Sequence, residues 1–186
     1  RIFLTAGDTG SVTIEKSLKV SNVDSSGGTV SVTGGTIFVS GDIDVSSASG
    51  AGGTAYIFSE NRSDFTGAID ASGNGSDGSG GFVEISSHKV VSISGDVTAG
   101  IGGTFLIDPE TIVIGSGSET GVSYISASTL TSALSTSTDV IIWTGVADGF
   151  TGTHDEDGSD TWGEGDIVIT DKVEYGSKGN LTFLAV

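Results

Sequence analysis

The sequence predicts an all-β protein, a right-handed parallel β-helix with three short strands in each coil of about 25 residues. Three observations support this fold class: glycine pairs recur at a nearly constant spacing, alternating apolar residues follow each pair, and the composition is unusual. The chain contains 31 Gly, a single Pro, and neither Cys nor Met. Compact enzymes rarely have such a composition, whereas repetitive β structures do.

The first element of the repeat is a glycine pair followed by a strand. The pairs are Gly27-Gly28, Gly52-Gly53, Gly80-Gly81 and Gly102-Gly103. Their second glycines are 25, 28 and 22 residues apart. Each pair precedes a segment in which every second residue is apolar, as in Val30 and Val32, and this period of two is typical of a strand. Glycine permits the positive φ that tight corners need, so we expect each pair to form a corner.

Two further strands follow in each repeat. One includes Ile37 and Val39 in the first repeat and Val91 and Ile93 in the third, and Phe65 is expected to take the equivalent place in the second. The other follows Gly41, Gly67 and Gly95, and it contributes the apolar residues Ile43, Ile69 and Val97. The turns between these strands are too short for a helix, which favours a coil with three strands.

Stacking of the coils predicts which residues become neighbours. Parallel strands in successive coils pair at about 4.8 Å. The predicted interior rows are Val30, Ala55, Val83 and Phe105; Val32, Ile57, Ile85 and Ile107; and Ile43, Ile69 and Val97. A right-handed sense follows from the general handedness of parallel crossovers. A β-sandwich would also explain the alternation, but it would not explain the period.

The repeat predicts three regions in the chain. We expect residues 1–114 to form coils of the β-helix, residues 115–139 to form an insertion, and residues 140–186 to form further coils with an acidic loop at 147–166. In the insertion, Leu130, Ala133 and Leu134 have helical spacing and serines precede them. These residues predict a short helix over 126–134. Strands are expected again at 140–143, 167–169 and 181–184.

Charge and composition exclude several classes of function. Asp and Glu number 24 against 7 Lys and Arg, giving a net charge of −17 that would repel nucleic acid and anionic membranes. We find no apolar run long enough to insert into a membrane. Because Met is absent, we expect Arg1 to be an internal residue of a longer protein, and we expect the strand at the C-terminus to be cut as well.

The segments around the last two glycine pairs resemble a known family. Residues Gly80 to Ser86, Gly95, and Gly102 to Ile114 are similar to a passage in large exoproteins of the filamentous haemagglutinin and two-partner-secretion class. The preceding run from Phe65 to Gly73 and the later residues Leu130 to Ile142 are similar as well. The resemblance covers about residues 27–144, although Ser87 stands where the family often has Gly and the acidic loop is unusual.

This resemblance implies a structural and adhesive shaft segment of a secreted or cell-surface bacterial exoprotein, with no catalytic role. It implies export through an outer-membrane two-partner-secretion transporter, and adhesion to a host-cell glycan or protein receptor as a function of the whole protein. Two alternatives remain: a polysaccharide-acting enzyme on a β-helix, and the stalk of a contact-dependent toxin delivery protein.

The acidic loop is a candidate calcium site. Carboxylate oxygens are the ligands that Ca²⁺ prefers. The loop concentrates Asp155, Glu156, Asp157, Asp160, Glu164 and Asp166. However, Gly158 comes directly after Asp157, and no glutamate stands at the spacing of a calcium loop. We therefore favour a solvated acidic loop, keep Ca²⁺ as the alternative, and expect no other cofactor.

Catalytic residues cannot be assigned. His88 is expected at a corner and His154 beside acids, and two scattered histidines without Cys do not indicate a nucleophilic site. Carboxylate pairs remain open for cleavage of polysaccharides. The aromatic residues alternate with the interior rows, so they form either an exposed strip that binds glycan or protein or a set that packs locally, which we favour. They are Phe38, Tyr56, Phe58 and Phe82, with Trp143 and Trp162 assigned to packing.

Overall fold

The protein is an all-β molecule of parallel strands in the computed structural model, which describes residues 1–74, 79–117, 120–144, 165–176 and 178–185. Strands dominate this part of the chain, and its one helix is α1. The elements are β1 (Ile2–Thr5), β2 (Ser11–Ile14), β3 (Leu18–Lys19), β4 (Thr29–Val39), β5 (Asp42–Asp44), β6 (Thr54–Phe65), β7 (Ala68–Asp70), β8 (Phe82–Ser87), β9 (Val90–Ile93), β10 (Asp96–Thr98), β11 (Thr104–Asp108), β12 (Ile112–Ile114), β13 (Ser123–Ile125), α1 (Ala127–Ser135), β14 (Asp139–Thr144), β15 (Ile167–Ile169) and β16 (Leu181–Ala185).

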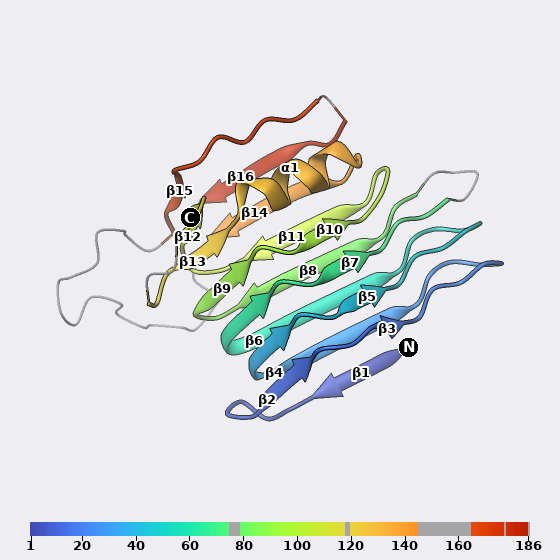
Figure 1. Cartoon of the computed structure of the whole chain (residues 1–186), viewed down its shortest axis with the longest axis horizontal. Coiled ribbons are helices and arrows are strands. Elements are labelled where there is room, and N and C mark those ends of the chain that lie inside the picture. The colour runs from blue at the N-terminus through green and yellow to red at the C-terminus, as the bar shows by residue number, and fades with distance from the viewer. Residues whose placement is uncertain (75–78, 118–119, 145–164, 177, 186) are drawn as a thin grey trace.

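The strands form two sheets, one of 12 strands and one of four, among the described residues. The larger sheet contains two ladders of paired strands. The first ladder consists of β1, the first half of β4 and of β6, β8, β11, β14 and β16. The second ladder consists of β2, the second half of β4 and of β6, β9, β13, β12 and β15. The third ladder is the small sheet β3, β5, β7 and β10. Figure 1 shows the layers following one another in chain order from blue to yellow-green.

The predicted interior rows are confirmed. Val32 is paired with Ile57, Ile57 with Ile85, and Ile85 with Ile107, so these four residues are vertical neighbours. The row from Val30 to Phe105 and the row from Ile43 to Val97 have the same arrangement. All of these side chains are buried. Burial of each large aliphatic side chain stabilises a fold by roughly 1.5 to 3 kcal/mol, so the rows dominate the stability.

The first two strands of a repeat are continuous in two of the repeats, whereas the sequence predicted separate short strands. β4 and β6 each run from the first ladder into the second, and the pairing shifts register between Gly34 and Thr36. Phe65 pairs with Val39 and Ile93, as predicted. Inside the bend of β6 lie two buried serines, Ser59 and Ser63, whose hydroxyl groups are 2.9 Å apart. This hydrogen bond pairs two buried hydroxyl groups for which the surrounding apolar side chains offer no partner.

The explanation of the glycine pairs by positive φ was wrong for the first three pairs. Positive φ occurs at Gly102 of the last pair, but at no glycine of the other three. Close approach of the backbone requires glycine there instead. A Cβ atom on Gly27 would collide with the carbonyl oxygen of Val45, and one on Gly53 would collide with that of Gly28. Each of these three pairs therefore lies where main chains from successive layers of strands approach closely.

The short helix is confirmed and begins one residue later than predicted. Ser126 is its N-cap, since its hydroxyl accepts a hydrogen bond of 3.0 Å from the backbone N–H of Thr129. The buried side chains Leu130, Ala133 and Leu134 face the body of the protein. In Figure 1 the helix lies over β10, so it covers the end of the third ladder. Beyond β10, the described residues add no strand to this ladder.

The strand β13 was not predicted. β13 lies between β9 and β12 in the second ladder, although β12 precedes it in the chain. Ile125 pairs with Ile93 on one side and with Ile114 on the other, and all three are buried. The strand has only three residues and follows no glycine pair, so neither alternation nor the repeat marks it in the sequence.

Candidate functional site

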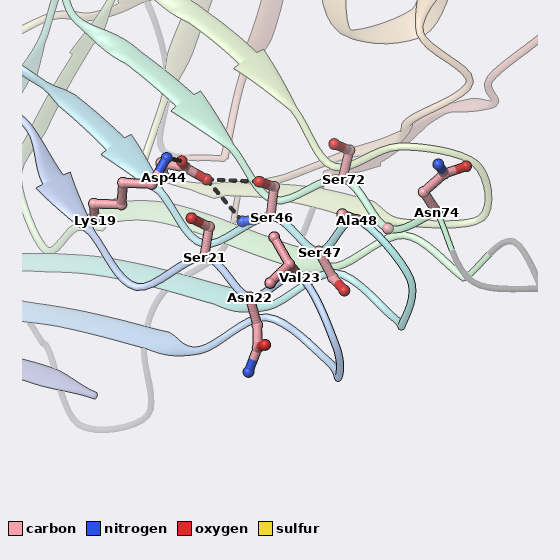
Figure 2. Close-up of a pocket in the computed structure, with 11 residues that line it drawn as sticks. Lys19, Ser21, Asn22, Val23, Asp44, Ser46, Ser47, Ala48, Ser72 and Asn74 are labelled. Atoms are coloured by element: carbon pink, nitrogen blue, oxygen red, sulfur yellow. Dashed lines mark hydrogen bonds and ion pairs between the residues drawn. The ribbon is translucent and has the colours of Figure 1, made fainter.

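A polar groove of about 510 Å³ opens beside the third ladder, where β3, β5 and β7 end. Three serines, Ser21, Ser46 and Ser72, line it from equivalent places, two residues after each strand (Figure 2). The backbone pairing continues through these residues, because the N–H of Ser47 donates to the carbonyl of Ser72 over 2.9 Å and the N–H of Asn22 donates to that of Ser46 over 3.0 Å. The serines therefore repeat at the spacing of parallel strands, about 4.8 Å.

Asp44 carries the strongest electrostatic interaction in the groove. Its Oδ2 accepts from Lys19 Nζ at 2.7 Å, and its Oδ1 accepts from the hydroxyl of Ser46 at 2.6 Å and the N–H of Ser46 at 3.1 Å (Figure 2). Partial burial raises the pKa of Asp44, but these hydrogen bonds outweigh burial and lower the pKa to about 2. Both oxygens of this carboxylate thus already accept hydrogen bonds from Lys19 and Ser46.

Further along the groove, polar groups are free to meet a ligand. Within the part of the chain that the structure describes, the hydroxyl of Ser72 and the side-chain amide of Asn74 have no hydrogen-bond partner. These groups donate and accept, and the open groove exposes them to solvent. The groove can therefore hold a polar, hydroxyl-bearing molecule through hydrogen bonds.

A second candidate site lies on the outer side of the first ladder. The rings of Tyr56 and Phe58, both on β6, are stacked with centroids 6.3 Å apart. The ring of His88 meets Phe58 edge-on at 4.8 Å. Nδ1 of His88 lies 2.8 Å from Oε2 of Glu60. The local packing favoured from the sequence is present here, but both rings of the stack remain half-buried and not enclosed.

Two carboxylates lie beside these rings. Glu84 on β8 pairs in register with Tyr56, and Asp108 on β11 pairs with Ser86. Burial raises the pKa of Glu84, and the nearby Asp108 raises it further, while a hydrogen bond from Ser86 opposes both effects. Burial also raises the pKa of Asp108, although His88 partly opposes this. The pKa of Tyr56 is raised by burial and by both carboxylates. The three groups therefore form one electrostatically coupled cluster.

The other aromatic residues considered from the sequence lie in different places. Phe82 is on the first ladder, in register with Thr54 and Thr104. Phe38 is 42% exposed and belongs to the second ladder, where it pairs with Asp64, so it does not join the stack. Trp143 on β14 is 45% exposed, in contrast to the packing role that we predicted.

Most of the acidic loop at 147–166, the candidate calcium site, lies outside the described residues. The same holds for His154 and Trp162. Of the loop's acids the structure describes Asp166, which is exposed, and its carbonyl accepts a hydrogen bond of 3.0 Å from the N–H of Ile112. Among the described residues, no group of three or more His, Cys, Asp or Glu could hold a metal ion. Calcium binding by the loop stays a prediction.

Sequence reasoning did not identify the groove or the carboxylate pair. Glu84 and Asp108 occur in strands that the repeat predicted, and their outward parity could be read from the alternation. Their approach depends on the register between β8 and β11, which places them on diagonal positions. The repeat contained a signal for this pair of carboxylates. Two successive strands each have an acidic residue at an outward-facing position, Glu84 on β8 and Asp108 on β11.

The fold and these two sites define an all-β protein of stacked parallel strands with polar and aromatic outer surfaces. No family model, curated protein or solved structure matches the chain. In the described residues there is no helix of the length and apolar character needed to span a membrane.

Proposed function

We propose that this chain is a segment of a right-handed parallel β-helix and forms part of the shaft of a large bacterial exoprotein. In this proposal the parent is of the filamentous haemagglutinin type, secreted or held at the cell surface, and the segment is structural and adhesive without a catalytic role. The observation that carries the proposal is the buried row Val32, Ile57, Ile85 and Ile107, which continues through four layers.

The stacking of layers supports a shaft. Each coil adds one layer of strands, so length grows by about 4.8 Å per coil. Three parallel ladders, joined in sequence by short connections, are what a winding of this kind requires. The right-handed sense rests on the general handedness of parallel crossovers. Stiffness follows from buried aliphatic rows, because well-packed interiors deform little.

The register provides a sharp test of the winding. Thr54 and Phe82 occupy equivalent places, since they pair directly, so deletion of residues 54–81 removes one repeat and joins Gly53 to Phe82 in register. We expect the shortened protein to fold cooperatively and to be about 4.8 Å shorter by small-angle scattering. The control deletion of residues 54–67 removes part of a repeat and is expected not to fold. An unfolded product from the full-repeat deletion would contradict the winding.

The adhesive role needs its own experiment. Beads coated with the protein are expected to bind host epithelial cells more strongly than beads coated with an equally acidic control protein. Screening of glycans and surface proteins then identifies the receptor class. Failure to exceed the control would remove the adhesive role and leave the shaft role standing.

Export and the absence of catalysis are tested separately. Co-expression of the parent gene with a two-partner-secretion transporter is expected to release the protein from the cell, and omission of the transporter should retain it. Incubation of the segment with pectins, alginates and other polyuronates should yield no cleavage products. Specific cleavage would favour the enzymatic alternative, in which carboxylates such as Glu84 act on the polysaccharide. The sequence of the whole reading frame separates an adhesin shaft from the stalk of a toxin.

A further inference from the structure

The outer side of the first ladder combines flat rings with negative charge. Two outward rows lie side by side. Tyr56, Glu84 and Leu106 form one row, and Phe58, Ser86 and Asp108 form the other. Glu84 and Asp108 are therefore diagonal neighbours on adjacent strands, and such positions lie about 7 to 8 Å apart. The ring stack of Tyr56 and Phe58 borders the two carboxylates on the side of β6.

The described part of this surface has little positive charge to compensate its carboxylates, since only His88 acts on one of them, Asp108. None of the described strand segments of the first ladder contains Lys or Arg. The basic group nearest to the rings is His88, and its Nδ1 faces Glu60 at 2.8 Å. Glu84 receives a hydrogen bond of 2.9 Å from Ser86, which is neutral. Glu84 and Asp108, both half-buried, thus repel each other; His88 opposes this in part at Asp108 only, and a cation bound beside Glu84 would relieve the repulsion.

The geometry favours an organic cation over a metal ion. Calcium takes six to eight oxygen ligands, and the described residues offer no group of three or more metal-binding side chains. Aromatic faces attract cations, and a guanidinium group both stacks on rings and donates to carboxylates in its plane. Leu106 and Ile141, paired in register and half-buried, extend the surface with apolar area suited to a polypeptide chain.

We propose that this surface binds an arginine side chain of a partner polypeptide, with the guanidinium group between the Tyr56–Phe58 stack and the carboxylates of Glu84 and Asp108. Apolar residues beside that arginine contact Leu106 and Ile141. This binding is independent of the shaft role, because it uses the outer side of the strands and leaves the interior rows unchanged.

Three matched peptides test the chemistry on the unaltered protein. Each is a capped tripeptide with leucine at both ends and arginine, citrulline or lysine in the centre. Citrulline has nearly the shape of arginine without its charge. By calorimetry we expect the arginine peptide to bind about tenfold more tightly than the citrulline peptide, with lysine between them. Equal affinity for the arginine and citrulline peptides would overturn the proposal.

Matched variants locate the site. Glu84→Gln and Asp108→Asn each remove one charge, and each should weaken the arginine peptide by about tenfold. Asp96→Asn on β10 is the control, since it removes the same charge from an exposed residue on the third ladder. Tyr56→Leu keeps apolar volume without the ring and should also weaken binding. If Asp96→Asn weakens binding as much as Glu84→Gln, the effect is general attraction to an acidic protein and the site is refuted.

Proton release provides a second readout. The titratable groups facing the site are Tyr56, Glu60, Glu84, His88 and Asp108. A bound guanidinium group favours the ionised carboxylates, so the peptide should release protons and bind more tightly as the pH rises through their titration. This linkage should disappear in the double variant Glu84→Gln/Asp108→Asn. Proton release that persists in the double variant would overturn the assignment. The deletion experiment on the shaft is unaffected by either outcome.

Discussion

The hydroxyl groups of Ser59 and Ser87 lie 2.9 Å apart on adjacent strands, inside a core made largely of aliphatic rows. Ser63 Oγ lies 2.9 Å from Ser59 Oγ, so Ser59 is the centre of a buried hydrogen-bonded chain. These hydrogen-bonded serines lie in the bend where β6 leaves the first ladder for the second.

Removal of the central hydroxyl should destabilise the protein. Ser59→Ala is expected to lower the free energy of unfolding by roughly 1 to 3 kcal/mol, because its buried partners lose hydrogen bonds. Urea denaturation measures this change. The control Ser40→Ala alters an exposed serine and should have an effect below about 0.5 kcal/mol. Similar effects for both variants would mean that the buried serine hydrogen bonds contribute nothing to the free energy of unfolding.

Adjacent residues of β11 provide a test of the interior rows. Ile107 is fully buried, whereas Leu106 is half-buried on the outer side. We expect Ile107→Ala to lower the free energy of unfolding by about 2 to 5 kcal/mol, since it leaves a cavity between Ile85 and Ile142. Leu106→Ala removes a similar volume and should have a clearly smaller effect by the same denaturation assay. A larger effect for Leu106→Ala than for Ile107→Ala would mean that Leu106, and not Ile107, faces the core.

The paired glycines predict a steric effect. Gly53→Ala would place its Cβ against the carbonyl oxygens of Gly28 and Val45, neither of which can move without separating successive layers of strands. Loss of more than about 3 kcal/mol, or failure to fold, is the expected result. Gly7→Ala is the matched control, because a Cβ there meets no heavy atom within 4 Å. Circular dichroism and thermal melting of the two variants decide the question, and equal melting temperatures would refute the clash.

The Asp44 interaction predicts a dependence on pH. Its pKa falls from 3.8 to about 2 in the folded protein, so the stabilisation is present above pH 3.8 and is lost as the pH falls towards 2. The magnitude should stay below about 1 kcal/mol, because Lys19 is largely exposed. Asp44→Asn should therefore reduce stability at pH 5 more than at pH 2.5, measured by urea denaturation. Asp42→Asn on the same strand serves as the control, and a loss for Asp44→Asn that does not change with pH would contradict the assignment.

Particular residues illustrate how far the sequence alone reaches. The pairing of Phe65 with Val39 and Ile93 was predictable, because the three residues follow their glycine pairs at nearly equal distances, 11 residues for Val39 and 12 for the other two. The helix was predictable from Leu130, Ala133 and Leu134 because its apolar spacing is local. The place of β13 between β9 and β12 was not predictable, since β13 lies outside the glycine-pair repeat that specified the partners of other short strands. The coupling of Glu84 with Asp108 also depends on partners in another layer.

The sequence by itself determined the parallel all-β class, the interior rows and the helix, because alternation and period are properties of neighbouring residues. Only the tertiary structure decided the continuity of β4 and β6, the reason for the glycine pairs, and the two outer sites. These features arise from contacts between layers that are many residues apart in the chain. Their geometry is set by how closely the main chains approach, and this distance is not encoded by any local pattern.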